Sequence, residues 1–222
     1  MSVAPTAPFH GALPVAQRVA RRAFRIALSI HVCGLEHVPL EGPLIVAGNH
    51  TGFLDGPLVT AWVPRPIRTL TKVEIFKGFP GKALVYLGQI PVDRGIPDRT
   101  ALRRAREELA VGGAVGVFPE GTRGDGELGK IKDGIGYLAA LSGAPIVPVA
   151  VIGTQQALPK GAKIPRRSHE VHVVFGPAFS PAVGGDPHLR STCALVAEEI
   201  RVRLRAHLEQ VRRDLDPGRT GG

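Results

Sequence analysis

Short apolar segments alternate with helical segments along almost the whole chain, and this alternation constrains the fold more than any other feature. The predicted strands are rich in Val, Ile and Leu and cover residues 30–35, 44–47, 68–71, 114–118, 146–152 and 170–175. The predicted helices cover residues 57–63, 74–87, 98–111 and 135–141, and a long helix from Asp186, followed by Pro187, to about Asp214. Such alternation is typical of an α/β domain with a largely parallel mixed sheet flanked by helices, in which ligands bind beyond the carboxyl ends of the strands. The chain shows neither an internal repeat nor a convincing linker, so we predict a single domain.

An amphipathic basic helix precedes this domain. Residues 1–13 contain no Lys or Arg and no apolar core of signal-peptide length, so we expect a flexible tail there. Over residues 14–29, a helical projection gathers the arginines on one arc and leaves the apolar residues, with Phe24 among them, on the rest. This pattern suits a helix in the headgroup layer of an anionic membrane, but also a helix packed on its own domain with its arginines in solvent. The basic residues are Arg18, Arg21, Arg22 and Arg25.

The charge balance limits the class of partner. The chain of 222 residues carries 28 Lys and Arg against 19 Asp and Glu, a net charge of +9 that favours nucleic acid, anionic lipid or phosphorylated and CoA-type ligands. Aromatic residues make up only 5%, which argues against nucleic acid. No apolar run approaches the roughly 18–20 residues of a membrane-spanning helix, so we expect a cytoplasmic protein. Cys33 and Cys193 lie far apart, and no histidine or cysteine cluster has metal-binding spacing, so we expect no metal.

The turn after the strand predicted at 44–47 carries the first candidate for chemistry. It has the sequence Gly-Asn-His-Thr-Gly-Phe-Leu-Asp, in which His50 and Asp55 are five positions apart. Asp55 could hold one ring nitrogen of His50 and leave the other free to take a proton. The alternative is a turn histidine beside an aspartate that starts a helix.

Three other segments offer anion-binding side chains where apolar segments end. Residues 118–123, Phe-Pro-Glu-Gly-Thr-Arg, combine Arg123 with backbone amides around Gly121 and Thr122, which could hold a phosphate, unless Glu120 and Arg123 only form a salt bridge. Arg94, next to Gly95, is a further candidate, or else part of an ordinary surface turn with Asp93. Lys72 could add to the same positive pocket, or be solvated at the start of a helix.

In combination these segments resemble the four ordered blocks of the glycerolipid acyltransferase family, most closely the bacterial 1-acylglycerol-3-phosphate acyltransferases. The blocks are 49–55, 90–94, 118–123 and 144–149, within a region of roughly 30–180. The resemblance implies an acyltransferase domain over 30–216. It also implies a general base at His50 with Asp55 as its orienting partner, and a role for Pro148 in acyl-donor binding or in packing of the site. The residues matched to acceptor binding are Lys72, Arg94, Glu120, Gly121, Thr122 and Arg123.

The implied reaction is direct acyl transfer. Neutral His50 removes the proton from the acceptor hydroxyl, whose oxygen attacks the thioester of acyl-CoA or acyl carrier protein, and the thiolate leaves. The acceptor implied is lysophosphatidic acid and the product phosphatidic acid, formed on the inner face of the cell membrane without a cofactor or metal. One alternative is another lysolipid, an aminolipid or a glycolipid as acceptor. A second is a non-catalytic protein that binds anionic lipid, which has no need of the His50 and Asp55 pair.

Overall fold

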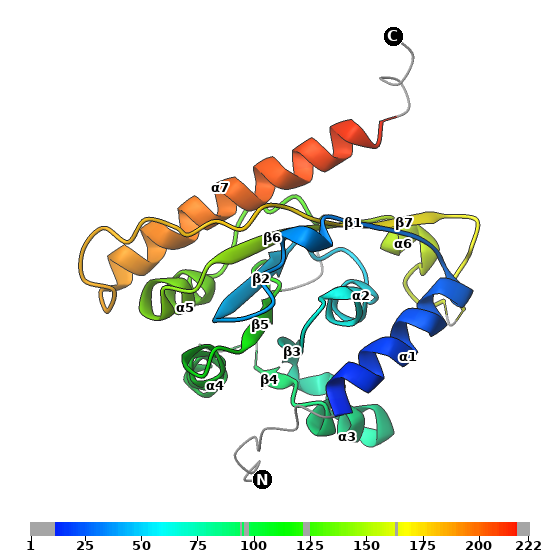
Figure 1. Cartoon of the computed structure of the whole chain (residues 1–222), viewed down its shortest axis with the longest axis horizontal. Helices are drawn as coiled ribbons and strands as arrows, with labels where there is room; N and C mark the ends of the chain where they lie inside the picture. Colours follow the sequence, from blue (N-terminus) through cyan, green and yellow to red (C-terminus); the bar gives the residue numbers. More distant parts are fainter. Residues whose placement is uncertain (1–11, 94, 96–97, 122–124, 163, 217–222) are drawn as a thin grey trace.

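The protein forms a single α/β domain with a seven-stranded sheet between two layers of helices (Figure 1). The structure is a computed structural model that describes residues 12–93, 95, 98–121, 125–162 and 164–216. The elements in chain order are α1 (Ala12–Ala27), β1 (Ser29–Cys33), the 3-10 turn η1 (Leu35–His37), β2 (Leu44–Gly48), α2 (Asp55–Trp62), β3 (Ile67–Lys72), the 3-10 turn η2 (Val73–Ile75), α3 (Gly78–Tyr86), β4 (Ile90–Val92), α4 (Arg99–Ala110), β5 (Ala114–Val117), α5 (Gly134–Ser142), β6 (Ile146–Ile152), α6 (Thr154–Ala157), β7 (Glu170–Phe175) and α7 (Arg190–Asp214).

The strand order confirms the predicted sheet. It runs β1-β7-β6-β2-β5-β3-β4. The strands from β6 to β4 in this order are parallel, β7 is antiparallel to β6, and β1 is parallel to β7. The carboxyl ends of β6, β2, β5, β3 and β4 therefore meet at one edge of the sheet.

Two hydrophobic clusters cover the two faces of the sheet. On β2, Leu44 and Val46 point into the cluster formed with α1 and α2, while Ile45 and Ala47 point into the cluster formed with α4, α5 and α7. Figure 1 shows these two groups of helices on opposite sides of the strands. Both faces of a parallel strand are buried, and for this reason β2 is a continuous apolar run rather than an alternating one.

The connections that follow β2 and β5 leave the sheet toward opposite faces. After β2 the chain passes into α2 on one face of the sheet, whereas after β5 it passes into α5 on the other face. Adjacent parallel strands whose connections leave toward opposite faces form a topological switch point, and ligands bind there at the carboxyl ends. The loops after β2 and β5 are the two that carry His50 and Glu120.

Helix α1 packs against α2 with part of its predicted basic face turned inward. Arg21 donates hydrogen bonds from its guanidinium to the carbonyl oxygens of residues 61–63 at the end of α2, and Gln17 donates to three carbonyls of the same region. The Phe24 ring lies 5.9 Å from that of Trp62. These contacts give Arg21 and Phe24 a role in the packing of α1 on α2, and their expected contact with a membrane surface stays a prediction.

The remaining arginines of α1 lie on its outer face. Arg18, Arg22 and Arg25 are exposed, beside an apolar stripe of Val15, Val19 and Ile26 that is 56–66% exposed. The helix spans 12–27 rather than 14–29, and most of the expected tail, residues 1–11, lies outside the described residues. Among the helices that the structure describes, none has both the length and the apolar content needed to cross a bilayer.

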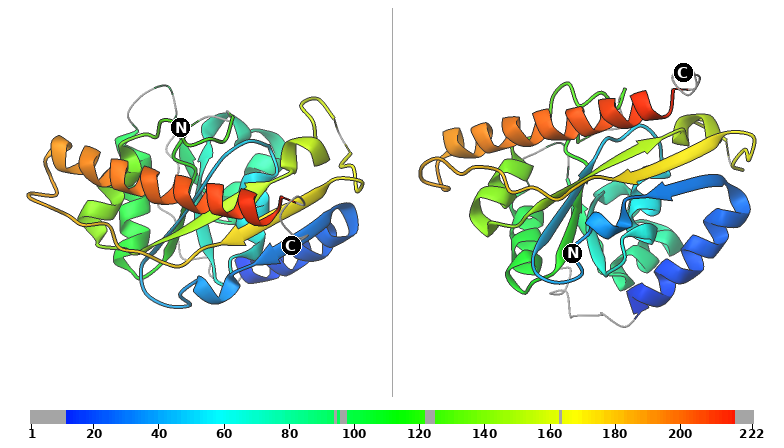
Figure 2. Two further views of the ribbon diagram at one scale, coloured as in Figure 1. Left: turned by 90° about the horizontal axis from the view of Figure 1, so that it is seen from above. Right: turned by 45° about the horizontal axis from the view of Figure 1, so that its top comes forward.

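The long C-terminal helix begins later than expected. Asp186 does not cap it; its carboxylate accepts a hydrogen bond from the His188 backbone N–H in a separate turn, and α7 starts at Arg190. Figure 2 shows α7 lying along one side of the sheet. The predicted apolar spacing within the helix is confirmed, because the six residues concerned are all buried: Cys193, Val196, Ile200, Leu204, Leu208 and Val211. The short elements β4 and α6 were not predicted.

The close approach of α5 and α7 depends on Gly136. A Cβ atom there would lie 2.0 Å from the carbonyl oxygen of Cys193 and 2.8 Å from the backbone nitrogen of Ala197. We expect Gly136→Ala to force the helices apart and to lower the free energy of unfolding by about 1–3 kcal/mol, although alanine favours helix. Gly129→Ala, where a Cβ atom would meet nothing within 4 Å, should change it by less than about 0.5 kcal/mol in equilibrium urea unfolding. Equal stability of the two variants would contradict this account of the helix contact.

Candidate active site

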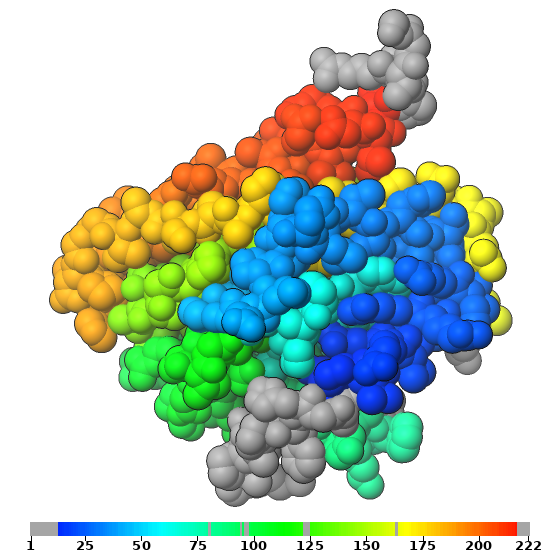
Figure 3. Space-filling model, viewed as in Figure 1, coloured from blue at the N-terminus to red at the C-terminus, as the bar shows by residue number. Residues whose placement is uncertain are grey.

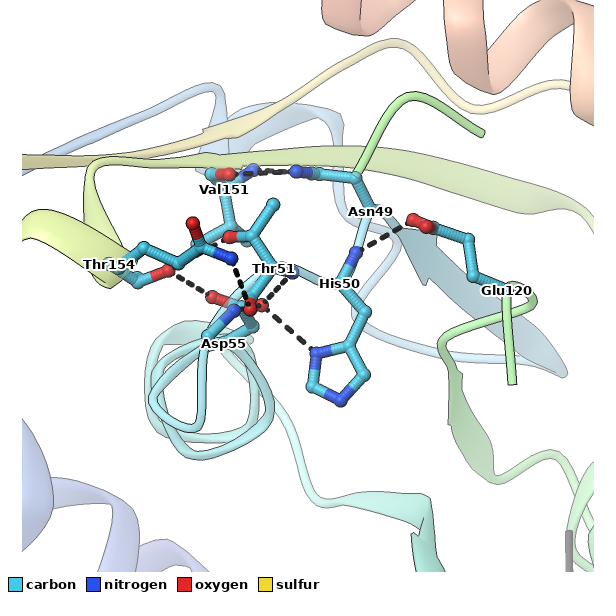
Figure 4. A network of polar contacts seen from close by, with 9 residues as sticks. Asn49, His50, Thr51, Asp55, Glu120, Val151 and Thr154 are labelled. Carbon is cyan, nitrogen blue, oxygen red and sulfur yellow. Dashed lines mark hydrogen bonds and ion pairs between the residues drawn. The ribbon is translucent and has the colours of Figure 1, made fainter. Parts of the chain in front are cut away.

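The side chain of Asn49 extends the sheet past the end of β2. Its amide nitrogen donates to the carbonyl oxygen of Val151 at 2.8 Å, and the Val151 N–H donates to the Asn49 side-chain oxygen at 2.8 Å (Figure 4). The Asn49 side chain thus takes the place of a backbone peptide group and adds one further pair of hydrogen bonds between the end of β2 and β6. They fix the backbone from which His50 projects at the carboxyl edge of the sheet.

The carboxylate of Asp55 is completely buried and accepts four hydrogen bonds. Its Oδ2 accepts from the backbone N–H groups of Thr51 at 2.6 Å and Gly52 at 2.7 Å, and from His50 Nδ1 at 3.0 Å. Its Oδ1 accepts from the hydroxyl of Thr154 at 2.5 Å. The predicted contact between His50 and Asp55 is present, and a carboxylate that receives four donors is held in one orientation.

The direction of these bonds sets the tautomer of His50. Because an ionised carboxylate only accepts, the proton of the neutral imidazole lies on Nδ1 and the lone pair lies on Nε2. Figure 4 shows Nε2 on the side of the ring away from Asp55. The ring also packs against Phe118, with ring centroids 4.7 Å apart. This contact and the hydrogen bond to Asp55 together restrict the orientation of the imidazole. A nitrogen presented in this way can act as a general base.

Thr154 links the carboxylate to Thr51. A hydroxyl has one proton, and that of Thr154 is donated to Asp55, so in the 3.1 Å contact between the two threonines the donor is the Thr51 hydroxyl. Gly52 leaves room for this arrangement, since a Cβ atom there would lie 2.6 Å from the Thr154 hydroxyl oxygen. These hydrogen bonds connect the turn after β2 to the start of α6 next to Asp55.

Glu120 joins the loop after β5 to the same site. One of its carboxylate oxygens accepts from the His50 backbone N–H at 2.9 Å, and the Gly126 N–H also bonds to it. Burial raises the pKa of Glu120, and the nearby carboxylates of Asp125 and Asp55 raise it further, against the lowering effect of the two backbone bonds. Its contacts are those of a residue that positions His50 rather than of a free ligand for substrate.

Gly126 and Glu127, which follow β5 in the chain, contact the turn after β2 and helix α7. A Cβ atom at Gly126 would lie 2.2 Å from a methyl carbon of Thr51 and 3.3 Å from the Asn49 amide nitrogen. The next residue, Glu127, accepts a 2.6 Å hydrogen bond from Arg212 near the end of α7. The C-terminal helix therefore reaches the loop that packs on the candidate site.

Two other predicted substrate-binding residues, Lys72 and Gly121, make contacts with neighbouring residues of the protein. Lys72, at the carboxyl end of β3, lies 2.8 Å from the carboxylate of Glu74. The Gly121 N–H donates to the carbonyl oxygen of Phe118, and a Cβ atom at Gly121 would meet the side chain of Lys132. The amide of Gly121 is therefore not free for the phosphate contact expected of it, whereas Lys132 brings a cation to this turn.

Pro148 lies inside the sheet. It is buried in β6 beside Ala47 of β2, and its carbonyl oxygen accepts a hydrogen bond from the Gly176 N–H. This placement favours the packing role over contact with an acyl donor. Three further candidates lie outside the described residues, namely Arg94, Thr122 and Arg123.

The residues that hold the pair in place were not predicted from the sequence. Asn49 stands in the predicted turn without a role, and neither Gly126 nor Thr154 was given one. The available signal was position, since Asn49 is a polar residue directly after β2 and Thr154 lies two residues after the end of β6. Within the described part of the chain, no group of three or more His, Cys, Asp or Glu could hold a metal ion.

Comparison with known proteins identifies a matching acyltransferase family and similar acyltransferases. A model of the Acyltransferase family matches residues 29–152, more than half of the chain. The chain is 34% identical over 139 residues to the chloroplastic 1-acyl-sn-glycerol-3-phosphate acyltransferase LPAT1 of Arabidopsis thaliana, a match that covers 60% of this chain but only 39% of the relative. It is 30% identical over 139 residues to the 1-acyl-sn-glycerol-3-phosphate acyltransferase of Bacillus subtilis, with coverage of 59% and 68%.

A solved structure shares the fold. The crystal structure of the 1-acyl-sn-glycerophosphate acyltransferase PlsC from Thermotoga maritima matches with a TM-score of 0.69 and 27% identity, over 90% of this chain and 79% of that one. The chain spans less than half the length of the plant relatives it matches, 39% for Arabidopsis and 42% for Brassica napus.

The raised pKa of Glu120 makes a prediction about stability. The folded protein holds the Glu120 proton more tightly than the unfolded chain, so this group stabilises most at low pH, and the contribution is lost as the pH rises through the raised pKa. Glutamine does not titrate. The free energy of unfolding of Glu120→Gln relative to wild type should therefore increase between about pH 4 and neutrality, measured by urea unfolding at several pH values.

Glu127→Gln is a control of opposite sign. Hydrogen bonding to Arg212 lowers the pKa of Glu127, so its stabilising contribution is present above the ordinary glutamate pKa and is lost as the pH falls through the lowered value. Relative to wild type, this variant should lose stability as the pH rises over that lower range. Parallel pH profiles for the two variants would contradict the assignment of Glu120.

Proposed function

The chain belongs to the Acyltransferase family, and on this basis we propose that it transfers a fatty acyl group from an acyl thioester to the hydroxyl of 1-acyl-sn-glycerol-3-phosphate, forming phosphatidic acid. The observation that carries the proposal is the His50 and Asp55 pair at the switch point, with the imidazole proton on Nδ1 and Nε2 directed away from the carboxylate. The names of the Arabidopsis, Bacillus and Thermotoga proteins support this acceptor.

The proposed reaction needs one proton carrier. Nε2 of His50 takes the proton from the acceptor hydroxyl as its oxygen attacks the thioester carbonyl, which forms a tetrahedral oxyanion. The oxyanion collapses, the carbon–sulfur bond breaks, and the imidazolium returns the proton to the departing sulfur. Asp55 keeps Nδ1 protonated and stabilises the imidazolium. Both substrates are bound together, so the steps require neither an acyl-enzyme nor a cofactor, and acyl-CoA or acyl carrier protein is the co-substrate.

Cations that follow the strands at the carboxyl edge of the sheet would bind the acceptor phosphate. Lys72 ends β3 at the same edge as His50, and Lys132 lies against the turn at Gly121. Arg94 and Arg123 follow β4 and β5, whose carboxyl ends meet at this edge, and a guanidinium matches phosphate oxygens in a bidentate geometry. Glu120 and Pro148 contribute by holding the site rather than by touching the phosphate.

The outer face of α1 supports a peripheral position on an anionic membrane. Its exposed apolar stripe and the neighbouring arginines Arg18, Arg22 and Arg25 combine the two attractions that hold an interfacial helix. The acceptor and the product are both lipids, so this position would bring the site to its substrate. We propose the inner face of the cell membrane as the location.

His50→Ala tests the proposed base. Loss of the base should lower kcat by about 100-fold or more, because positioned general bases contribute roughly 10²–10⁴-fold. The measurement is release of free CoA from acyl-CoA in the presence of lysophosphatidic acid, with urea unfolding to show that the variant is folded. His31→Ala, on β1, is the matched control and should keep wild-type turnover. Wild-type-like turnover by His50→Ala would remove His50 from the mechanism.

A panel of acceptors tests the substrate. Lysophosphatidic acid, monoacylglycerol, a neutral-headgroup lysolipid and an aminolipid are each incubated with a mixture of acyl-CoAs or acyl carrier proteins, and the products are identified by mass spectrometry. We expect phosphatidic acid as the main product. Faster acylation of an acceptor without the phosphate would favour another lysolipid, aminolipid or glycolipid. Vesicle binding with no acylation of any acceptor would favour the non-catalytic lipid-binding alternative.

A further inference from the structure

Helix α3 exposes large apolar side chains on its outer face. Phe79 is 85% exposed, and Tyr86, two turns further along, is 55% exposed. Lys82 and Ala83 lie between them on the same face, at the i, i+3, i+4 and i+7 spacing by which a helix normally packs on a core. Of the α3 residues whose side chains are described, none belongs to either hydrophobic cluster of the domain.

The first turn of α3 packs tightly on the residues directly before it. A Cβ atom at Gly81 would lie 2.2 Å from the backbone carbonyl carbon of Phe76, so this position accepts only glycine without a shift of the backbone. Figure 3 shows the blue-green α3 segment projecting from the lower edge of the molecule.

The charge around this face is positive. Residues 72–87 contain three lysines, Lys72, Lys77 and Lys82, and a single carboxylate, Glu74. Glu74 lies 2.8 Å from Lys72 and also interacts electrostatically with Lys77, so the three lysines outnumber the carboxylate and Lys77 and Lys82 remain exposed to solvent. An exposed aromatic ring flanked by lysines is suited to the boundary between anionic headgroups and acyl chains.

The size of the face argues against a protein partner. A helix of nine residues is about 14 Å long, so its outer face presents far less than the roughly 800 Å² that each partner contributes to a standard protein interface. A lipid surface has no such minimum, since one inserted aromatic side chain adds its own burial to that of other membrane contacts.

We propose that the outer face of α3, formed by Phe79, Lys82, Ala83 and Tyr86, docks on the surface of an anionic lipid bilayer. The segment leaves the sheet directly after Lys72, at the carboxyl edge where His50 lies, so docking holds this edge of the sheet toward the membrane. This surface is separate from the outer face of α1. The inference rests on the proposed function only in taking the acceptor to be a membrane lipid.

Phe79→Ala is the decisive variant, and Leu195→Ala on α7 is its matched control. Leu195 is also an exposed apolar side chain, at 70%, on a helix outside the candidate site. With the full chain, sedimentation with vesicles of phosphatidylglycerol and phosphatidylcholine should show about tenfold weaker binding for Phe79→Ala and unchanged binding for Leu195→Ala. Lys82→Glu should weaken binding to these vesicles but not the residual binding to pure phosphatidylcholine.

Activity measurements with two acceptors distinguish an error in the docking proposal from an error in the proposed reaction. With lysophosphatidic acid in vesicles, Phe79→Ala should raise the apparent KM for acceptor about tenfold at unchanged kcat; with a short-chain acceptor below its micelle concentration, both constants should equal those of wild type. Wild-type-like vesicle binding by Phe79→Ala would overturn the docking surface, as would a change in self-association or carrier-protein binding without a change in vesicle binding. Absence of acyl transfer by the wild type to either acceptor would overturn the proposed reaction instead.

Discussion

A carboxylate removed from water has to be supplied with hydrogen-bond donors, and the arrangement of the site depends on how this is done for Asp55. Three of its four donors come from the turn after β2, and the fourth is Thr154, the first residue of α6. Gly52 has to be a glycine because Thr154 occupies the space of a side chain. The His50 ring has to carry its proton on Nδ1 because Asp55 only accepts. One buried charge thus constrains the turn after β2, the start of α6 and the tautomer of His50, and an unpaired charge in the same place would be strongly destabilising.

The sheet brings the remaining parts together. Because β6, β2 and β5 are adjacent and parallel, the residues that follow them in the chain, far apart in sequence, meet at one edge. Asn49 ties the β2 loop to β6, and Glu120 ties the β5 loop to the backbone of His50. The bond between Arg212 and Glu127 then connects α7, which lies beyond the region matched by the family model, to the loop that packs on Thr51 and Asn49. An exposed ion pair contributes little stability by itself, so its effect is the placement of this loop.

The sequence was sufficient for features encoded by local pattern. Alternating apolar segments predicted the α/β sheet, and the ends of β6 and β7 coincide with the prediction. The pairing of His50 with Asp55 was also predictable, since both belong to one turn. Contacts between distant segments were not: Thr154 reaches Asp55 only because β6 lies beside β2. Local rules also did not give the start of α7. Asp186 can cap a helix, but its carboxylate accepts a hydrogen bond from the His188 N–H in the turn before the helix. On α1 the helical projection grouped the arginines correctly but could not tell that Arg21 faces the end of α2.

The net charge of +9 is divided by the structure into two populations. One population serves the fold. Arg21 and Arg65 donate to backbone carbonyls, Arg68 forms a buried ion pair with Glu108, and the arginines of α7 that bond to neighbouring glutamates are Arg201, Arg203 and Arg205. The arginines that pair with carboxylates are neutralised locally and add little attraction for a distant anion. The other population includes Arg18, Arg22 and Arg25 on α1, Lys77 just before α3 and Lys82 within it, all exposed to solvent. These residues combine charge with exposed apolar surface nearby, so in the proposed membrane association they, rather than the total charge, would decide which surface of the protein faces an anionic lipid.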